Sequence, residues 1–416
     1  MFIKSVDIEN FKGISKLKFN PKKINILVGK NNTGKTSVLE AIDLLFHNEN
    51  IQNPFMHSFF NIYSEEKSIK ISANFGDKEE KIEIREAKER EAISNFSKDL
   101  VRSFLENFSK KSKKTFSGIL TRELEKLIEN YIDDELRNFL LKNSLVLLDG
   151  NSEEKIYYSS YDYSLINKIE ILIENITKNL LEKLPSEQRD DSEFRRHLKY
   201  ASENTLFSTR GILMEHRHGA KPIKKDVVYI NSLEEELYGR RPISQRKPED
   251  SERLHKVEKI VKENNLVRNL EGLDFDNVVF QTKEGIKAHS FHFLGDGFKS
   301  MIGLLWKLSD KINNIVVMLD EPEKHIHPGY IKQLMKFIID FSKRLNIQFF
   351  ITTHSLDLLD IVLSEELDEE ERAFLKDELN ILRMDKIRDS ITIAENLDYE
   401  KAVETKDELQ LDLRGV

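Results

Sequence analysis

The stretch that most constrains the fold of this chain is an apolar run followed by a glycine-bounded loop. Residues 24–28 read as a buried strand, and residues 29–36 match the pattern G-x-x-x-x-G-K-[ST] at every required position. A chance glycine turn before a helix is the alternative interpretation, but strand, loop and helix occur in the order that the pattern requires. The sequence therefore predicts a phosphate-binding P-loop within an α/β fold.

The spacing within this loop has a chemical reason. Gly29 and Gly34 let the backbone curl, so that successive N–H groups point inward and hold a β-phosphate. Lys35 adds positive charge near the β- and γ-phosphates, Thr36 offers a hydroxyl to Mg²⁺, and the helix over 35–46 begins with its positive dipole end on the anion. The predicted nucleotide contacts are the consecutive loop residues Gly29, Lys30, Asn31, Asn32, Thr33, Gly34, Lys35, Thr36 and Ser37. ATP and Mg²⁺ are the predicted ligands.

A second apolar strand ends in two carboxylates. After residues 315–319, Asp320 is placed to hold Mg²⁺ through its water shell, and Glu321 to orient and deprotonate the attacking water. His354 follows the next predicted strand, residues 348–352, where an imidazole can donate to the γ-phosphate or the water. An acidic turn and a surface histidine are the ordinary alternatives, but the P-loop in the same chain favours ATP hydrolysis. The predicted catalytic residues are the P-loop lysine Lys35 together with Glu321 and His354.

Composition narrows the class of protein. The 416 residues suffice for two or three domains, and 39% hydrophobic with 33% charged residues indicates a folded, helix-rich chain. The absence of cysteine excludes disulfides, thiolate metal sites and cysteine nucleophiles. Residues 1–4 lack a signal-peptide core and no run approaches the about 20 apolar residues of a membrane span, so we expect a cytoplasmic protein without a membrane partner. The net charge of −8 disfavours a globally basic nucleic-acid binder but leaves a local patch open.

Local patterns divide the chain into three parts. Residues 68–75 and 80–85 alternate at period two and predict a hairpin, whereas the pattern from about residue 86 to about residue 209 is helical. One apolar stripe in the helical part comprises Ile166, Ile169, Ile173, Ile176 and Leu180. The predicted domains are an N-terminal ATPase lobe at 1–85, a helical insertion at 86–209 and a C-terminal ATPase lobe at 210–416.

The order of the motifs resembles that of the ABC-class ATPases of the SMC, RecF and OLD group. The shared motifs are the P-loop, residues 10–13 (NFKG), 294–300 (LGDGFKS), 319–323 (LDEPE) and 353–355 (THS). Within this group the chain resembles most the OLD-like ATPases without a Toprim domain, including the ATPase component of PARIS-type anti-phage systems. The resemblance implies a P-loop NTPase of the ABC or SMC head type. Such a fold has a mixed sheet, an antiparallel β subdomain and an inserted helical domain, for which a coiled coil is one arrangement.

The resemblance also implies roles for particular residues. Residues 294–300 stand in place of the signature motif, so Gly295, Gly297 and Lys299 are expected to contact the nucleotide of a second subunit. Gly295 occupies the position where the group has a serine. We therefore expect backbone N–H groups at the start of the helix over 297–308 to make this contact.

Four further assignments follow from the same resemblance. Asp320 and Glu321 correspond to the Walker B pair, and His354 to the switch histidine. Lys12, within the NFKG motif, is implied as a further nucleotide contact. The glutamine of the Q-loop has no clear counterpart, and Asn231 is the candidate that we name for it.

Two functions are compatible with these residues. The first is an ATP-driven switch that forms a homodimer or a higher homo-oligomer around ATP and controls a separate effector protein in phage defence or DNA maintenance. No nuclease is expected, because the acidic residues 365–371 read as a solvated helix. The alternative is a RecF-like ATP-dependent DNA clamp, with DNA as partner, which basic clusters at 110–114, 217–225 and 240–247 favour. Such clusters are more often solvated faces.

Overall fold

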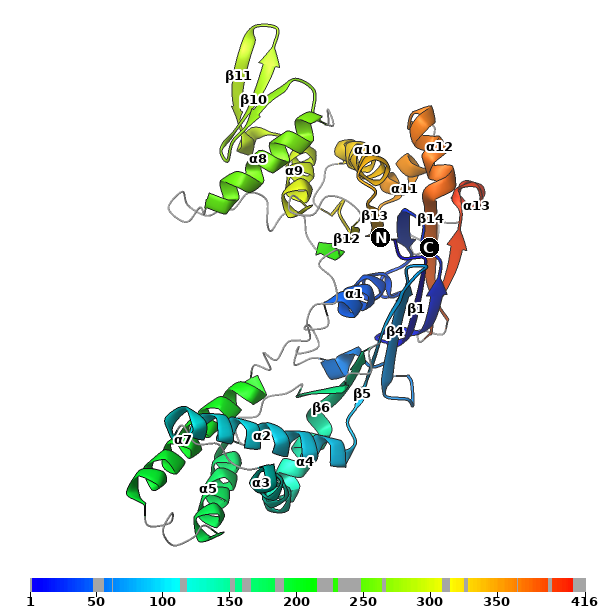
Figure 1. Cartoon of the computed structure of the whole chain (residues 1–416). Helices are drawn as coiled ribbons and strands as arrows, with labels where there is room; N and C mark the ends of the chain where they lie inside the picture. Colours follow the sequence, from blue (N-terminus) through cyan, green and yellow to red (C-terminus); the bar gives the residue numbers. More distant parts are fainter. Residues whose placement is uncertain are drawn as a thin grey trace. The chain divides into compact units, whose positions relative to one another are not determined.

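The structure is a computed structural model of the chain (Figure 1). It describes residues 2–47, 56–61, 63–112, 118–149, 154–158, 166–183, 191–214, 227–230, 248–263, 267–308, 315–324, 328–364, 366–387 and 391–406. The chain forms two compact units. Unit 1 comprises residues 1–46, 71–80 and 224–416, and unit 2 comprises residues 47–70 and 81–223.

The centre of unit 1 is a six-stranded mixed sheet with the order β15-β14-β3-β13-β12-β8. The strands are β3 (Ile24–Val28), β8 (Val227–Ile230), β12 (Val316–Asp320), β13 (Gln348–Thr352), β14 (Leu379–Ile387) and β15 (Ile391–Leu397). All neighbouring strands are parallel except β14 and β15, which form an antiparallel pair. Strands β3 and β13 are buried along their whole length, as expected for central strands of a sheet covered on both faces. The predicted mixed sheet is confirmed.

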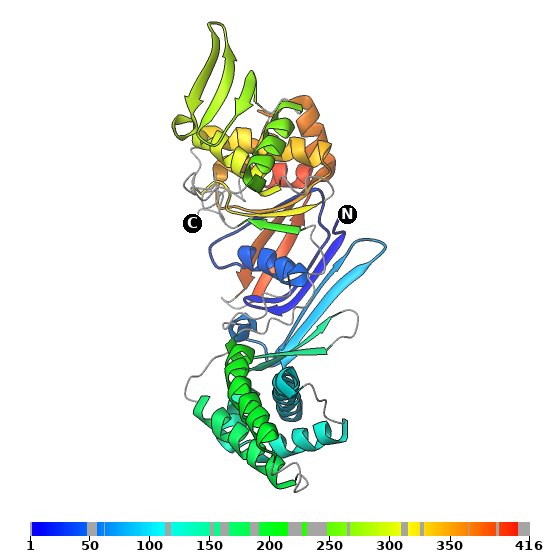
Figure 2. The same cartoon turned by 60° about the vertical axis from the view of Figure 1, so that its left-hand side comes forward.

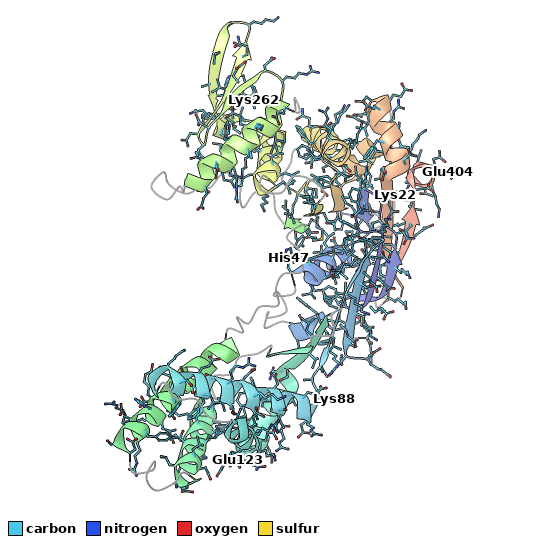
Figure 3. The ribbon with its side chains drawn as sticks, viewed as in Figure 1. Lys22, His47, Lys88, Glu123, Lys262 and Glu404 are labelled. Carbon is cyan, nitrogen blue, oxygen red and sulfur yellow. The ribbon has the colours of Figure 1, made fainter. Side chains whose placement is uncertain are left out.

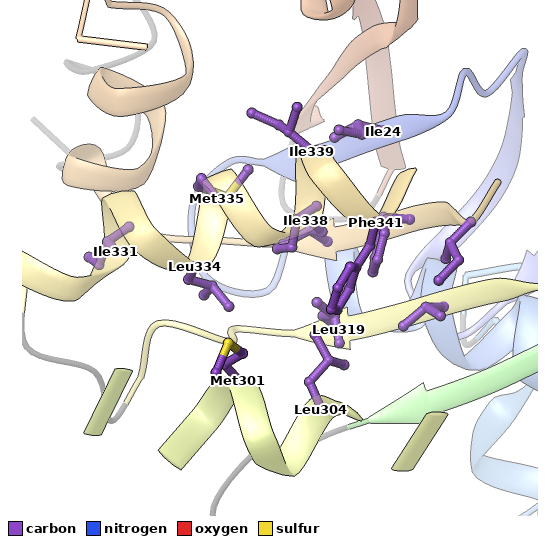
Figure 4. Packing of buried hydrophobic residues seen from close by; sticks show 14 of the residues in the cluster. Ile24, Met301, Leu304, Leu319, Ile331, Leu334, Met335, Ile338, Ile339 and Phe341 are labelled. Atoms are coloured by element: carbon purple, nitrogen blue, oxygen red, sulfur yellow. The ribbon is translucent and has the colours of Figure 1, made fainter. Parts of the chain in front are cut away.

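Helices of unit 1 pack on this sheet or on one another. They are α1 (Lys35–Phe46), α8 (Pro248–Glu263), α9 (Asp296–Leu308), α10 (Pro328–Arg344), α11 (Leu356–Val362), α12 (Glu369–Glu378) and α13 (Tyr399–Glu404). Figures 1 and 2 show α1 on one face of the parallel strands and α10 on the other. Side chains of α10 at a spacing of three and four residues, Ile331, Leu334, Met335 and Ile338, pack with Met301 and Leu304 of α9 in one apolar cluster (Figure 4).

Unit 1 also contains antiparallel strands. They are the hairpin of β1 (Ser5–Phe11) and β2 (Ile14–Phe19), the tip of the hairpin of β4 (Ser68–Asn74) and β5 (Glu79–Glu86), and a three-stranded sheet of β9 (Leu270–Leu273), β10 (Asn277–Thr282) and β11 (Gly285–Ser290). The predicted antiparallel β subdomain and hairpins are thus present. Strand β9 was not predicted, because four residues are too short for a clear alternation. Strand β11 ends at residue 290, and a short 3-10 helix, η5 (Phe291–Phe293), follows it.

Unit 2 is mainly helical (Figure 2). Its elements are η2 (Met56–Phe59), α2 (Glu89–Ser112), α3 (Gly118–Tyr131), α4 (Asp134–Asn143), β6 (Ser144–Asp149), β7 (Glu154–Tyr158), α5 (Ile166–Lys183) and α7 (Ser192–Met214). Four members of the predicted apolar stripe on α5, Ile169, Ile173, Ile176 and Leu180, lie in the buried core of this unit. Across the described parts of both units, no helix is both long and apolar enough to cross a bilayer.

Candidate nucleotide site

Three of the predicted motifs follow strands that are neighbours in the sheet. The P-loop follows β3, Asp320 is the last residue of β12, and Thr352 is the last residue of β13, which lies between them. The register pairs Asp320 with Thr352 and Thr352 with Leu27. Because parallel strands end at the same edge of the sheet, the chain brings these motifs together there, where open α/β sheets bind ligands.

The P-loop has a backbone that few side chains tolerate. The φ angles of Gly29, Asn32 and Gly34 are +144°, +63° and +98°. A Cβ atom on Gly29 would lie 2.1 Å from the carbonyl oxygen of Met384. Glycine at position 29 is therefore required by backbone conformation and by close packing. The loop ends at Lys35, the first residue of α1, so the helix N-terminus faces the loop.

Lys35 is buried beneath the loop, with 5% of its surface exposed. Its Nζ donates to the carbonyl oxygens of Gly29 (2.8 Å) and Lys30 (2.9 Å). Burial lowers the pKa of Lys35 to about 8, against the opposing effect of the nearby carboxylates, of which Glu321 has the largest. The site thus contains a cation that lacks full solvation and that a bound anion would stabilise in the charged form.

Thr36 and Asp320 lie side by side at the start of α1. The Thr36 hydroxyl Oγ1 donates to Asp320 Oδ1 at 3.0 Å, and the Thr352 hydroxyl donates to the same oxygen at 2.5 Å. A hydroxyl and a carboxylate so close together are the hard oxygen ligands that Mg²⁺ prefers. The residues present therefore fit a Mg²⁺ ion, which in P-loop enzymes is bound together with phosphate oxygens.

Glu321 and His354 face each other beside this pair. His354 Nε2 lies 3.4 Å from Glu321 Oε1, and about 30% of each side chain is exposed. The φ of Glu321 is +46°, a left-handed conformation that costs a non-glycine residue about 1 to 2 kcal/mol. Two hydrogen bonds from Glu321 N to Thr352, to Oγ1 (3.0 Å) and to the carbonyl oxygen (3.2 Å), hold it there. Burial, followed by the charge of Lys35, lowers the pKa of His354, which favours the neutral imidazole.

Sequence reasoning placed Glu323 and Thr353 in shared motifs but did not predict that they bond to each other and support His354. Glu323 Oε1 accepts from Thr353 Oγ1 (2.6 Å) and from the backbone N–H of His354 (3.2 Å). Burial raises the pKa of Glu323. The signal in the sequence was a run of polar residues directly after two buried strands, and only the fold shows that the two runs bond to each other.

The turn between β1 and β2 contains Lys12. Both Asn10 and Lys12 have positive φ, at 57° and 52°. Lys12 Nζ forms an ion pair with Glu40 of α1 and lies 5.7 Å from the centre of the Phe11 ring. The structure thus places this predicted contact residue beside the helix that follows the P-loop.

The residues predicted to stand in place of the signature motif, 294–300, lie at the start of α9. Gly295 is half-buried, its carbonyl oxygen accepts from Lys299 N (3.2 Å), and Gly297 is the second residue of the helix. Phe293, just before this loop, is 89% exposed. Thr36 links the P-loop to Asp320, and Thr352 bonds to Glu321. The hydrogen bond given for Gly295 is instead to Lys299 of the same segment.

Some predicted features fall outside the described residues. They are Asn231, most of the basic cluster at 110–114 and the basic clusters at 217–225 and 240–247.

The chain is similar to several known ATPases and DNA-related proteins. The model of the AAA ATPase domain family matches residues 1–359. Endonuclease GajA of Bacillus cereus is 25% identical over 426 residues, which cover 86% of this chain and 58% of GajA. The DNA replication and repair protein RecF of Clostridioides difficile is 26% identical over 285 residues, 58% of this chain and 75% of RecF. An ATP/GTP phosphatase of Helicobacter pylori is 23% identical over 381 residues, 86% of this chain and 87% of the phosphatase.

The chain therefore spans less than two thirds of the length of GajA. The solved SMC head domain from Thermotoga maritima aligns with a TM-score of 0.44 at 11% identity, over 95% of this chain and 99% of that chain.

Proposed function

Because this chain belongs to the AAA ATPase domain family, we propose that it hydrolyses ATP at the edge of the sheet in unit 1 and uses the ATP cycle as a switch. The resemblance to the SMC, RecF and OLD group is confirmed by the family match and by the similarity to RecF and GajA. The observation that carries the proposal is the cluster of Lys35, Thr36, Asp320, Glu321 and His354 at the ends of three adjacent strands.

Each residue of the cluster has a chemical task in the proposed reaction. The backbone N–H groups of the P-loop and Lys35 bind the phosphates, and Thr36 with Asp320 holds Mg²⁺. When bound, Mg²⁺ supplies positive charge to the phosphate oxygens. Glu321 orients the attacking water and takes its proton, and the neutral His354 donates a hydrogen bond toward the γ-phosphate.

The switch requires a second copy of the chain. In our proposal, the signature loop of one copy covers the P-loop of the other, so that ATP joins two subunits and hydrolysis releases them. Support comes from the place of residues 294–300 at the start of α9, where backbone N–H groups of a helix N-terminus can contact an anion. The output is a homodimer or higher homo-oligomer that controls a separate effector in phage defence or DNA maintenance.

A RecF-like DNA clamp is the second candidate. It is favoured by the 26% identity to a protein named for DNA replication and repair. Filter binding with duplex DNA at two salt concentrations, with and without ATP, separates the two candidates. Retention that needs ATP and falls steeply with salt supports the clamp, because phosphate contacts release counterions.

The catalytic assignment is tested by two substitutions with different consequences. We expect Lys35→Ala to weaken ATP binding by more than about 100-fold, since it removes charge-assisted bonds to phosphate. Glu321→Gln should leave binding within about twofold and lower kcat by roughly 10² to 10⁴, the range of general-base catalysis. The measurements are calorimetric titration with ATP and release of inorganic phosphate.

A matched control is Lys262→Ala, an exposed lysine on α8 that pairs with Glu258 (Figure 3). This variant should bind and hydrolyse ATP like the unmodified protein. A Glu321→Gln protein that hydrolyses ATP at the unmodified rate contradicts the assignment.

A further inference from the structure

The antiparallel pair β14 and β15, here the β14–β15 hairpin, packs directly against the P-loop. Strand β14 is parallel to β3, and Arg383 pairs with Val28, so Met384 lies beside Gly29. The Met384 carbonyl oxygen occupies the space where a Cβ on Gly29 would project, at 2.1 Å. A Cβ on Gly34 would lie 3.4 Å from Thr392 Oγ1 of β15. Both glycines of the P-loop therefore face the same hairpin.

Thr392 is the residue of this hairpin that makes polar contact with the loop. It is 1% exposed, and its Oγ1 lies 2.9 Å from the carbonyl oxygen of Gly13 and 3.0 Å from that of Thr33. A hydroxyl has one hydrogen, so it donates to one of the two carbonyls at a time. Gly13 follows Lys12 in the β1–β2 turn, and Thr33 is in the P-loop. One buried hydroxyl thus contacts two segments with predicted nucleotide contacts.

The P-loop needs partners for its carbonyl groups. A loop that turns its N–H groups toward a phosphate turns carbonyls away from it, and buried carbonyls without partners are costly. Lys35 Nζ serves the carbonyls of Gly29 and Lys30, and the Thr33 hydroxyl also donates to Lys30. Lys35 is also the proposed phosphate ligand, so its bonds to the loop compete with that task. The bond from Thr392 comes from behind the loop and is compatible with a bound phosphate.

We propose that Thr392 is a positioning residue, which holds the P-loop in its phosphate-binding conformation and ties it to the β1–β2 turn. The β14–β15 hairpin is then a structural part of the nucleotide site. It lies beyond residues 1–359, the part that the family model matches, so the family match does not include it. The inference deepens the proposed function and rests on it.

Two pairs of variants isolate the hydroxyl. Thr392→Val keeps the shape of the side chain and removes the hydroxyl. Thr392→Ser and Thr392→Ala both lack the methyl group, and of the two only Thr392→Ser keeps the hydroxyl. We expect Thr392→Val to raise the Kd for a non-hydrolysable ATP analogue with Mg²⁺ about tenfold, the effect of one lost buried hydrogen bond. The Kd of Thr392→Ala for the same analogue should exceed that of Thr392→Ser by a similar factor. Calorimetric titration measures both differences.

Ser342→Ala is the matched control. Ser342 is fully buried in the same unit, and its hydroxyl donates to the carbonyl oxygen of Ile347 at 2.9 Å, at the end of α10. This variant should lower the melting temperature about as much as Thr392→Val does and leave the Kd unchanged. If both variants lower the melting temperature and neither changes the Kd, Thr392 has only a general structural role and the proposal is wrong.

Hydrogen exchange without nucleotide provides a readout that does not depend on ATP binding. The amides of residues 29–36 should exchange faster in Thr392→Val than in the unmodified protein or in Ser342→Ala. If the unmodified protein binds no nucleotide but this difference is present, the proposed function is wrong and the positioning role of Thr392 is supported. If nucleotide binds and neither hydrogen exchange nor affinity changes in Thr392→Val, the positioning role of Thr392 is wrong and the proposed function is unaffected.

Discussion

Two glycine-containing loops of unit 1 each lead into a helix, and they differ in their contacts with the rest of the unit. In the P-loop before α1, Thr33 and Lys35 are buried and the β14–β15 hairpin fills the space beside both glycines. The signature loop before α9 contains the half-buried Gly295 and follows Phe293, which is 89% exposed. The P-loop packs against a hairpin of its own unit while residues 30–32 stay exposed, and the second loop is half-buried where it is described and follows an exposed phenylalanine.

The difference shows what each loop can do alone. Amides at a helix N-terminus bind anions when they are held in place, and buried packing holds those of the P-loop. The P-loop is thus prepared to bind a phosphate within one subunit. The start of α9 carries the same kind of amides, and in our proposal they contact a phosphate that a second subunit holds. The predictions below test this contrast.

The largest effect is expected from Gly29→Ala. The added Cβ would lie 2.1 Å from the Met384 carbonyl oxygen at a φ of +144°, so the loop or the hairpin must move. We expect ATP binding to weaken by more than about 100-fold and the free energy of unfolding to fall by about 3 kcal/mol, because overpacking adds to backbone strain. Calorimetric titration and urea denaturation measure the two effects.

The control for this substitution is Gly285→Ala in the β10–β11 turn. Gly285 has a φ of +113°, but nothing lies within 4 Å of a Cβ there. This variant should lose only about 1 to 2 kcal/mol of stability and keep its affinity for ATP. Equal losses of affinity in both variants would show that the P-loop does not pack against the hairpin as described.

Gly297→Arg tests the other loop. Because the P-loop supplies the phosphate contacts within one subunit, affinity for ATP should stay within about twofold. A side chain at the start of α9 should block the approach of a second subunit, so ATP-dependent dimers should disappear in light scattering and most hydrolysis with them. A Gly297→Arg protein that hydrolyses ATP normally as a monomer shows that the site is not shared.

Mixing variants sharpens this test. When Gly297→Arg protein is mixed with Lys35→Ala protein, each mixed dimer has one complete site. This site joins the P-loop of the Gly297→Arg chain to residues 294–300 of the Lys35→Ala chain. Partial recovery of phosphate release in the mixture is the expected result if one complete site suffices. The two variants assayed separately at the same total concentration are the control.

The smallest expected effect is the uptake of a fraction of a proton when ATP binds. The pKa of Lys35 is lowered to about 8, and the negative charge of bound ATP raises it, so binding takes up a proton. The uptake should be about 0.1 proton at pH 7 and about half a proton at pH 8, and affinity should fall as pH rises above 8. Titrations in buffers of different ionisation enthalpy measure it. Lys35→Arg, which stays charged, should lose this uptake.

The central motifs of the site could be predicted from the sequence because each occupies a short stretch next to a buried strand. The glycine spacing identifies the P-loop, and a parallel sheet brings Asp320 and His354 to its edge. Thr392 could not be predicted, because Ile-Thr-Ile reads as any strand and its partners Gly13 and Thr33 are distant in sequence.

Domain boundaries depend on long-range packing and were harder to infer. Unit 2 includes residues 47–70 and extends over 81–223, whereas the helical pattern placed an insertion at 86–209. The pattern detects the helices themselves, but the unit also includes strands β6 and β7 and flanking segments that have no helical period. The exact limits of the insertion stay a prediction.

The sheet of unit 1 determines the order in which this protein can fold during synthesis. Asn25 Nδ2 of β3 bonds to the carbonyl oxygen of Phe349 in β13, 324 residues later. Contacts this distant in sequence form slowly and wait until the ribosome has made both partners. Residues 81–223 of unit 2 are contiguous, and their helices contain one core of their own. We therefore expect the inserted unit to fold first on the ribosome, and the early P-loop strand to gain its sheet neighbours only when β13 and β14 emerge.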